Sequence, residues 1–367
     1  MSVREGRSLP KQMATSAGRE ARAVLVPIAA AVLLAIAACQ SGGGGSPSPA
    51  ASPGGSPGGS PGGSPGGSPG APAGSPAPGT QRLTIATGGT GGVYFPLGGG
   101  LAQELTENIE GVSATAQETS ASVDNMLLIG SGEAHVAFVL GDTAADAVEG
   151  RAQFEGAPID ACTLGILYSN FTQVVTTTNT GIETIEDLRG KRVSVGALGS
   201  GTEVIALRIL EAAGINPDAD LGGRSQLLID ETVDGLKDGT IDAGFWSGGL
   251  PTGALVDLPN LKLIPTAEYT AALADEFGPF YLEKDIPANT YAGQTEAVST
   301  IVVPNVLVVN PSMAEDLQRQ ITDVLFAQKD DLVAVHMAAS ELDPATAGDV
   351  EFMDVCPGAQ AYYDEAG

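Results

Sequence analysis

Residues 192–215 read RVSVGALGSGTEVIALRILEAAGI, and this stretch decides the fold. A short β-rich run ends in a glycine turn, and apolar residues then recur at helical spacing. Residues 83–96 repeat this order, because LTIA leads into the glycine loop GGTGGVYFP, where another helical pattern begins. In α/β folds, ligands bind beyond the C-terminal ends of strands, where such loops meet helix N-termini. The two loops therefore predict two lobes that face one ligand.

Strand and helix patterns alternate through the rest of the folded chain. Such alternation predicts parallel sheets with helices on their faces, so we expect an α/β fold. The longest patterns are a strand over residues 164–178, a late strand over 299–310 and one amphipathic helix over 312–336. The chain from residue 82 onward is long enough for two domains with separate cores.

The glycine turn in ALGSGTEV exposes main-chain N–H groups to a ligand. Gly199 and Gly201 allow the backbone to turn, and Ser200 and Thr202 add hydroxyl groups. The following helix directs its N-terminal N–H groups at the same point, which favours negative charge there. Because the GxxxxGK pattern of a nucleotide-binding loop is missing, we expect a bound carboxylate rather than a polyphosphate. A plain helix cap with tight packing explains the same residues, and this alternative stays open.

Residues 1–39 have the pattern of an export signal. Five basic residues precede the apolar run VLVPIAAAVLLAIAAC, which is shorter than the roughly 20 residues of a membrane span. Its last four residues resemble a lipobox, in which Cys39 is lipidated and becomes the new N-terminus. We predict a lipoprotein signal peptide and a lipid anchor on the outer face of the cytoplasmic membrane. A short membrane anchor and an ordinary cleaved signal are the alternatives.

Residues 40–81 form a low-complexity segment. They repeat Ser-Pro-Gly-Gly and carry no charge and no large apolar side chain. Such a segment cannot bury enough surface to offset its ordering entropy. We therefore predict a disordered tether that lifts the folded part off the membrane.

The chain is strongly acidic and has three cysteines. Its formal charge is −27, and loss of the basic leader brings it to roughly −30, which argues against nucleic acid and anionic lipid as electrostatic partners. We attribute the acidity to the solubility of an exported protein. Besides Cys39, the chain has Cys162 and Cys356. In an oxidising compartment these two are candidates for a disulfide, with two unrelated buried thiols as the alternative.

Six segments, in this order, carry a resemblance to a known family: LTIATGGTGGVYFPLGGGLAQEL, SASVDNMLLIGSGEAHVAFVLGDTAADAVEG, DLRGKRVSVGALGSGTEVIALRILEAAGI, LKDGTIDAGFWSGGLPTGAL, DIPANTYAGQ and HMAAS. Together they closely resemble the TAXI family, the extracytoplasmic solute receptors of tripartite ATP-independent periplasmic (TRAP) transporters. The resemblance implies a type II periplasmic-binding-protein fold with two α/β lobes, a hinge of crossing strands and one ligand cleft between the lobes. Lobe I would comprise residues 82–170 and 296–367, and lobe II residues 171–295.

The resemblance also implies the ligand, the partner and the site. Known ligands of the family are small carboxylates such as glutamate, glutamine and 2-oxoglutarate, and the partner is a membrane permease that runs on an ion gradient. No cofactor and no metal is implied. The residues expected around the ligand are Thr90, Gly91, Gly92, Tyr94, Ser122, Asn125, Asp142, Ser200, Gly201, Thr202, Glu203, Gly248, Gly249, Pro251 and Thr252.

Some of these residues have a role that their chemistry suggests. Tyr94 offers an apolar wall with a polar tip. Ser122 and Asn125 lie one helical turn apart, which puts a hydroxyl and an amide on one face. Asp142 ends a strand pattern, where its carboxylate would hold an ammonium group or order water, or else cap a helix. Trp246 puts a bulky side chain next to the site.

An enzymatic function finds no support in the sequence. No Ser-His-Asp order, metal-ligand cluster or paired-acid motif stands out, and we expect His135 and His336 to be structural. We predict a solute-binding protein that is not an enzyme and that delivers its ligand to a TRAP permease. The alternative is a ligand-binding lipoprotein that serves a membrane sensor.

Overall fold

The computed structural model describes residues 80–366. The predicted signal peptide with Cys39, and the tether apart from its last two residues, lie outside the described residues. Because β1 (Gln81–Ala86) starts at Gln81, the folded part begins one residue before the expected position. Among residues 80–366, no helix combines the length and the apolar character that a membrane span requires.

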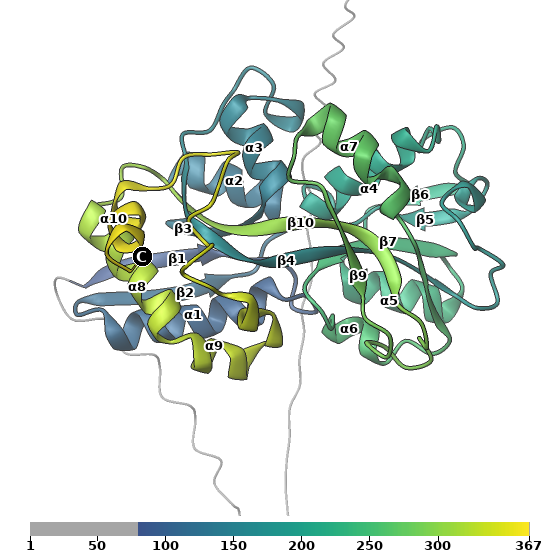
Figure 1. Cartoon of the computed structure of the whole chain (residues 1–367). Coiled ribbons are helices and arrows are strands. Elements are labelled where there is room, and N and C mark those ends of the chain that lie inside the picture. Colours follow the sequence, from purple (N-terminus) through teal and green to yellow (C-terminus); the bar gives the residue numbers. More distant parts are fainter. Residues whose placement is uncertain (1–79, 367) are drawn as a thin grey trace, which may run out of the picture. The chain divides into compact units, whose positions relative to one another are not determined.

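The described residues form one ten-stranded sheet in the order β2-β1-β3-β10-β4-β7-β5-β6, with β8 paired to β4 and β9 to β10 (Figure 1). The strand bounds are β1 (Gln81–Ala86), β2 (Val112–Gln117), β3 (Val136–Leu140), β4 (Cys162–Thr177), β5 (Arg192–Ser194), β6 (Gly223–Ser225), β7 (Ala243–Gly248), β8 (Leu261–Ile264), β9 (Leu282–Ile286) and β10 (Val298–Val309).

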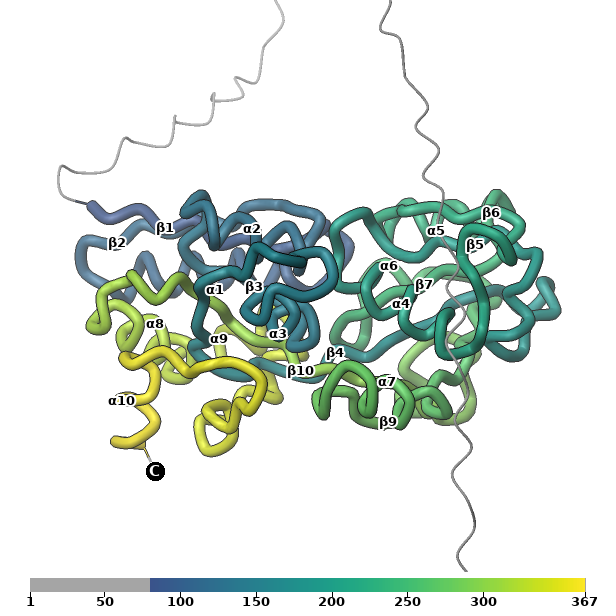
Figure 2. Tube along the Cα trace, turned by 90° about the horizontal axis from the view of Figure 1, so that it is seen from above, coloured from purple at the N-terminus to yellow at the C-terminus, as the bar shows by residue number. Residues whose placement is uncertain are grey.

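The sheet has a parallel part at each end and antiparallel strands between them. β1 pairs in parallel with β2 and β3, and β5 pairs in parallel with β6 and β7. The long strands β4 and β10 run antiparallel to each other and join the two parts. Figure 2 shows the same arrangement from above, with β4 and β10 passing from one group of elements to the other. The expected parallel sheets are therefore present in each lobe, and the hinge consists of these two crossing strands.

Helices cover both faces of each part of the sheet. Those beside β1, β2 and β3 are α1 (Tyr94–Asn108), α2 (Ser122–Ser131), α3 (Gly141–Glu149), α8 (Glu315–Ala327), α9 (Lys329–Val335) and α10 (Pro357–Ala366), with the short turns η1 (Ala152–Phe154) and η4 (Met337–Glu341). Those beside β5, β6 and β7 are α4 (Gly201–Ala212), α5 (Ile229–Asp238), α6 (Gly253–Val256) and α7 (Thr270–Phe277), with η2 (Glu186–Leu188) and η3 (Ala267–Tyr269). We call the first group lobe I and the second lobe II.

Each lobe has an apolar core on both faces of its sheet. In lobe I, Leu101 of α1 and Ile321 of α8 pack on one face, and Met126 of α2 packs on the other. In lobe II, Ile205 of α4 lies in one cluster and Val233 of α5 in the second. Burial of each such side chain stabilises the fold by about 1.5–3 kcal/mol. Each lobe therefore has apolar clusters of its own, and the clusters meet where the lobes touch, since Leu140 of lobe I packs with the Ile205 cluster and Val204 of lobe II with the Met126 cluster.

The amphipathic pattern over residues 312–336 is split into two helices, α8 and α9, where one was expected. Gln328, with φ −100° and ψ 23°, separates them. The change of direction brings α9 onto α1 at Gly100, where an added Cβ would lie 2.9 Å from Val335 Cγ2. Tertiary packing therefore overrides a sequence pattern that is continuous. The helices α3, α6, α7 and α10 and the strands β6 and β9 were not predicted.

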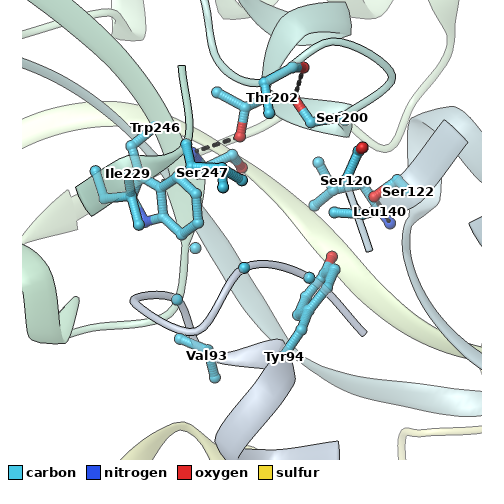
Figure 3. Close-up of a pocket in the computed structure, with 18 residues that line it drawn as sticks. Val93, Tyr94, Ser120, Ser122, Leu140, Ser200, Thr202, Ile229, Trp246 and Ser247 are labelled. Carbon is cyan, nitrogen blue, oxygen red and sulfur yellow. Dashed lines mark hydrogen bonds between the residues drawn. The ribbon is translucent and has the colours of Figure 1, made fainter. Parts of the chain in front are cut away.

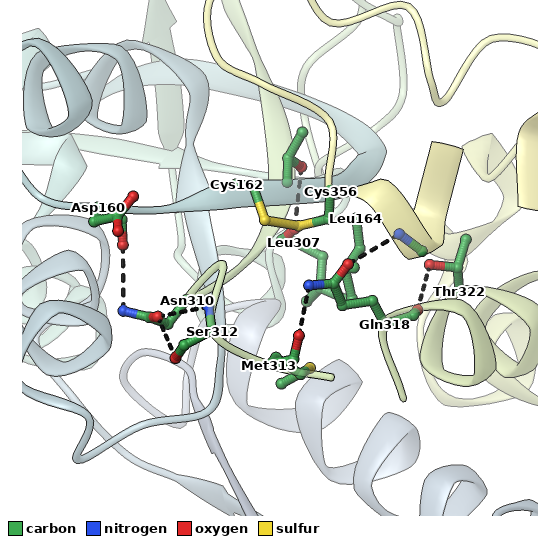
Figure 4. Close-up of a disulfide and its surroundings, with 12 residues drawn as sticks. Asp160, Cys162, Leu164, Leu307, Asn310, Ser312, Met313, Gln318, Thr322 and Cys356 are labelled. Carbon is green, nitrogen blue, oxygen red and sulfur yellow. Dashed lines mark hydrogen bonds between the residues drawn. A yellow bond between two sulfur atoms is a disulfide. The ribbon is translucent and has the colours of Figure 1, made fainter. Parts of the chain in front are cut away.

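A disulfide fastens the C-terminal segment to lobe I. Cys162, the first residue of β4, is bonded to Cys356, which precedes α10, and the two are 194 residues apart in the sequence (Figure 4). Both cysteines are buried. Hydrogen bonds continue the contact, because the Cys356 N–H donates to the Thr163 carbonyl and the Tyr363 hydroxyl to the Leu164 carbonyl.

Candidate functional site

A pocket lies between the two lobes, at the C-terminal ends of the parallel strands (Figure 3). It measures about 530 Å³ with its mouth included, which is the size of a small-molecule site. Lobe I lines it with Gly88, Gly89, Gly92, Val93, Tyr94, Ser120, Ala121, Ser122 and Leu140, and lobe II with Ala197, Ser200, Gly201, Thr202, Leu228, Ile229, Trp246, Ser247 and Gly248.

Four helices begin at this pocket. α1 and α2 approach from lobe I, and α4 and α5 from lobe II, each with its N-terminal residue against the pocket. The main-chain N–H groups of Gly201 and Thr202 at the start of α4 have no hydrogen-bond acceptor among residues 80–366. Helix N-termini carry partial positive charge, so the pocket attracts an anion. Within the described chain, no lysine or arginine lines it.

Ser200 both caps a helix and lines the pocket, which are the two roles that the sequence left open. It is the N-cap of α4, because its Oγ accepts a hydrogen bond from the Glu203 N–H at 3.1 Å and donates one to the Ala197 carbonyl at 2.7 Å. It also lines the pocket. The cap orients the first turn of α4, so that the free N–H groups face the space between the lobes.

Thr202 ties the start of α4 to the strand beside it. Its Oγ1 accepts a hydrogen bond from the Ser247 N–H at 3.1 Å, which links α4 to β7 (Figure 3). Both residues line the pocket. This hydrogen bond fixes two parts of the lobe II wall relative to each other.

Tyr94 is the main polar side chain of the lobe I wall. Its hydroxyl accepts a hydrogen bond from Asn305 Nδ2 at 2.6 Å. Burial raises the pKa of Tyr94, although the neighbouring polar side chains of Ser122, Asn305 and Asn170 lower it in part. The phenol therefore stays protonated at neutral pH. Ser122 accepts a hydrogen bond from the Leu140 N–H at 3.1 Å and so joins α2 to the end of β3.

The rims of the two lobes touch over the pocket. The Gly199 carbonyl of lobe II accepts hydrogen bonds from the N–H groups of Val123 and Asp124 at the start of α2, at 3.1 and 3.2 Å. A Cβ on Gly201 would lie 2.5 Å from Leu140 of lobe I, and one on Gly91 would lie 2.3 Å from the Asp230 carboxylate of lobe II. The structure is therefore a closed state. Glycine at positions 91 and 201 permits the two lobes to approach each other closely.

The structure brings some of the expected residues to the pocket and leaves others outside it. Gly92, Tyr94, Ser122, Ser200, Gly201, Thr202 and Gly248 line the pocket. The expected residues that do not line it are Thr90, Gly91, Asn125, Asp142, Glu203, Gly249, Pro251 and Thr252.

The residues outside the lining have structural contacts instead. The Asn125 amide donates to the carbonyls of Thr87 and Phe138 at 2.7 and 2.8 Å, so it fastens α2 to two strand ends. Glu203 accepts from the Gly199 N–H at 3.0 Å. Thr252 accepts from the Trp246 indole N–H at 3.0 Å and so positions that ring at the pocket. These three side chains therefore hold in place the segments that line the pocket.

Asp142 faces a buried charge cluster and not the pocket, contrary to the expectation from its place at a strand end. Its carboxylate accepts hydrogen bonds from the Tyr281 hydroxyl and the Thr143 N–H, both at 2.7 Å, and lies 3.5 Å from Arg208. Arg208 also bonds Asp146. Burial raises the pKa of Asp142, and Arg208 and Tyr281 oppose that shift. The cluster joins α3 of lobe I to α4 of lobe II.

Several lining residues were missed by the sequence reasoning. Gly88, Gly89 and Val93 belong to the first glycine loop, and Ala197 to the second, so the loops themselves were the signal. Ser247 lies in the same AGFWSGG stretch as Gly248 and next to Trp246. The remaining missed residues precede or begin helices or end a strand: Ser120, Ala121, Leu140, Leu228 and Ile229.

Both histidine side chains accept hydrogen bonds from main-chain N–H groups. His135 Nδ1 accepts from the Thr84 N–H at 3.1 Å, and His336 Nδ1 accepts from the Ala338 N–H at 3.0 Å. Among residues 80–366, no group of His, Cys, Asp and Glu side chains is arranged to hold a metal ion.

A solved structure with a bound small molecule shares this fold. PhnD1 from Prochlorococcus marinus, in complex with methylphosphonate, aligns with a TM-score of 0.50 at 12% identity over 70% of this chain and 90% of its own. The periplasmic aliphatic sulphonate binding protein SsuA from Escherichia coli aligns with a TM-score of 0.41 at 16% identity, over 78% of this chain and 83% of its own. The expected α/β fold with two lobes is confirmed. The sequence model of the NMT1-like family matches residues 85–367, and the chain therefore belongs to the NMT1-like family.

Proposed function

We propose that this protein is an extracytoplasmic solute-binding receptor of a TAXI-type TRAP transporter. It captures a small carboxylate, of the glutamate, glutamine or 2-oxoglutarate type, by lobe closure and delivers it to a permease that runs on an ion gradient. The observation that carries the proposal is the convergence of four helix N-termini on a pocket that both lobes close. The sequence resemblance to TAXI receptors supplies the transporter class.

The chemistry of the pocket favours a carboxylate of small size. Free N–H groups of Gly201 and Thr202 at the start of α4 offer two parallel donors, which suit the two oxygens of a carboxylate. Seryl hydroxyls from both lobes lie around the same space. Because no basic side chain lines the pocket within the described residues, the high negative charge of a polyphosphate would not be neutralised there.

The lining of the pocket by residues of both lobes supports the proposed lobe closure. A ligand contacts α1 and α2 of lobe I together with α4 and α5 of lobe II only when the rims meet. Its binding energy therefore selects the closed state. Closure would mark the receptor as loaded for its membrane partner.

A matched pair of glycine variants tests this mechanism. In the closed state, a Cβ on Gly201 would lie 2.5 Å from Leu140 and 2.8 Å from Ser122 Oγ across the cleft, whereas a Cβ on Gly99 meets no atom within 4 Å. We expect Gly201→Ala to weaken carboxylate binding at least tenfold and Gly99→Ala to leave it unchanged. Titration calorimetry on full-length protein, stripped of ligand, against a panel of small carboxylates and amino acids measures this.

Small-angle scattering of the same samples measures closure. We expect the radius of gyration to fall when the ligand is added to the wild type and the Gly99→Ala variant. Absence of binding across the whole panel would overturn the carboxylate proposal, and equal affinities for the two variants would overturn closure across Gly201.

Transport and anchoring are tested in cells. Ligand uptake should require the receptor and should stop when an ionophore collapses the ion gradient, because a TRAP permease uses no ATP. Replacement of Cys39 by Ser should move the protein from the membrane fraction to the soluble fraction, since the lipid attachment site is lost. Uptake that persists after collapse of the gradient would contradict the TRAP assignment.

A further inference from the structure

Trp246 of β7 forms part of the pocket wall and is the single tryptophan of the chain. The benzene ring of its indole reaches across the cleft to the glycine loop of lobe I, because a Cβ on Gly92 would lie 2.8 Å from Trp246 Cη2 and 2.9 Å from Cζ2. A side chain at position 92 would therefore collide with the ring when the lobes are closed. The indole closes the pocket on the side of that loop.

The opposite end of the pocket is the start of α4, where the proposed function places the carboxylate. There a Cβ on Gly201 would lie 2.8 Å from Ser122 Oγ of lobe I, so the two lobes meet at this end also. Figure 3 shows Trp246 on one side of the pocket and Ser122 and Ser200 on the other. A ligand whose carboxylate lies at the start of α4 therefore extends toward the indole.

The indole end of the pocket is apolar and tightly closed. Leu228 and Ile229 line the pocket at this end together with Trp246. Leu228 also reaches lobe I, since a Cβ on Gly89 would lie 3.1 Å from Leu228 Cδ2. Two side chains of lobe II therefore abut the same glycine loop. An extra methylene of a ligand would have to displace one of them or hold the lobes apart, because closed packing leaves little free space.

A buried hydrogen-bond network holds the indole in place. The Trp246 Nε1–H donates to Thr252 Oγ1 at 3.0 Å, and Gln173 Nε2 donates to the same oxygen at 3.0 Å. The Thr252 N–H donates to the Tyr291 hydroxyl at 2.9 Å, and that hydroxyl donates to Gln173 Oε1 at 2.5 Å. Thr252, Gln173 and Tyr291 are all buried. Because satisfied networks of buried polar groups are rigid, the ring cannot swing aside without breaking these bonds.

We propose that Trp246 sets the upper limit on ligand length, so that the closed receptor accepts a carboxylate as long as glutamate and discriminates against its homologue with one more methylene. Thr252, Gln173 and Tyr291 act as positioning residues that fix the ring. This inference rests on the proposed function, because the carboxylate at the start of α4 is the point from which the length is measured. One methylene in an apolar pocket changes affinity by about 10- to 200-fold.

Ligand pairs that differ by one methylene test the limit on the wild type. The pairs are L-glutamate and L-2-aminoadipate, L-glutamine and L-homoglutamine, and 2-oxoglutarate and 2-oxoadipate, each compared by titration calorimetry of full-length protein stripped of ligand. In every pair with a binding member, we expect the shorter compound to bind about tenfold more tightly or better. Equal or tighter binding of the longer compound in any such pair would overturn this inference and leave the carboxylate receptor standing. Failure of every compound to bind would overturn the proposed ligand class together with this inference.

Replacement of the ring locates the limit at Trp246. Trp246→Leu removes most of this wall, and we expect it to reduce the preference for the shorter compound several-fold through tighter binding of the longer one. Trp246→Phe should show a smaller shift in the same direction. Phe280→Leu is the matched control, because Phe280 is a buried aromatic residue of lobe II outside the pocket lining, and it should keep the wild-type preference. An unchanged preference in both Trp246 variants, or an equal fall in the control, would contradict the role of the ring.

Fluorescence of the single tryptophan tests the positioning network. Thr252→Val removes the acceptor of the indole N–H, so we expect acrylamide quenching to rise and the preference for the shorter compound to fall several-fold. Thr266→Val is the matched control, because it also removes a buried hydroxyl that accepts a hydrogen bond, from the Ile301 N–H at 3.0 Å, but outside the pocket lining. It should leave quenching and preference at their wild-type values. Wild-type quenching and preference in Thr252→Val would overturn the positioning role of the network.

Discussion

Thr202 stabilises the pocket through the strand next to it. Its hydroxyl accepts a hydrogen bond from the Ser247 N–H of β7, and the residue lies in the first turn of α4. A buried N–H that loses its acceptor costs about 1–3 kcal/mol. The side chain therefore contributes to stability and holds two ligand-facing segments in register.

We predict that Thr202→Val lowers the free energy of unfolding by about 1–3 kcal/mol and weakens ligand binding, because the shape is kept and the acceptor is lost. Thr202→Ser, which keeps the hydroxyl, is the control. It should retain most of the free energy of unfolding and most of the ligand affinity. Urea unfolding and calorimetry measure the two quantities. Similar losses in the two variants would show that the methyl group matters more than the hydrogen bond.

His336 makes folding sensitive to mildly acidic pH. Burial lowers the pKa of this histidine below its ordinary 6.5, against an opposing effect of the Pro251 carbonyl. The neutral ring accepts the Ala338 N–H at the start of η4. Because the folded-state pKa is depressed, the stability that this group contributes is present above pH 6.5 and is lost as the pH falls through the folded-state value.

We predict that His336→Asn removes this part of the pH dependence, since asparagine is a good N-cap and does not titrate. Urea unfolding at pH 7.5 and pH 5 should show a larger loss of stability for the wild type than for the variant. If the two proteins lost stability in parallel, a group other than His336 would be responsible.

At the scale of elements, the loop before α4 closes onto the start of α2. The Gly199 carbonyl accepts two N–H groups of α2, and the residue has a φ of +78°. This contact satisfies helix donors of lobe I with an acceptor of lobe II. It exists only when the lobes are closed, so it couples a loop conformation to closure.

We predict that Gly199→Ala weakens ligand binding as well as folding. Alanine at a positive φ costs about 1 kcal/mol, and the shifted loop loses the bonds to α2. Gly132→Ala is a matched control, because Gly132 has φ +77° and open space around it, but caps the far end of α2. Both variants should lose similar stability, and only Gly199→Ala should lose affinity. Equal affinities in calorimetry would remove Gly199 from the closure mechanism.

At the scale of the whole folded part, β4 and β10 carry the connection between lobes, and the disulfide secures one end of it. Cys162 starts β4, so the bond to Cys356 holds the C-terminal segment against the strand that continues into lobe II. Neither cysteine lines the pocket. Removal of the disulfide should therefore lower the stability of the fold and leave ligand affinity nearly unchanged.

We predict that the double variant Cys162→Ala/Cys356→Ala loses about 2–5 kcal/mol of unfolding free energy, because the crosslink restricts the unfolded chain. Ligand affinity should change less than about twofold. Cys39→Ser, which replaces a cysteine outside the bond, should keep full stability. A large loss of affinity in the double variant would show that the C-terminal segment also shapes the cleft.

Local signals in the sequence were enough to predict much of this arrangement. Glycine loops after β1 and before α4 identified two helix N-termini of the site, because such loops have a recognisable composition. Short elements such as β6 and the split between α8 and α9 at Gln328 gave no local signal, since they depend on packing against distant segments.

The sequence by itself determined the two-lobed α/β fold, the glycine loops and the pair of cysteines, because these depend on local propensity, spacing and compartment. Only the tertiary structure decided which side chains face the ligand. Asp142 stands at a strand end, as expected, but Arg208 and Tyr281, far away in the sequence, direct its carboxylate into a buried cluster. Thr172 and Ser247 likewise become neighbours only through the pairing of β4 with β7, because side-chain neighbours across a sheet are set by strand pairing and not by sequence distance.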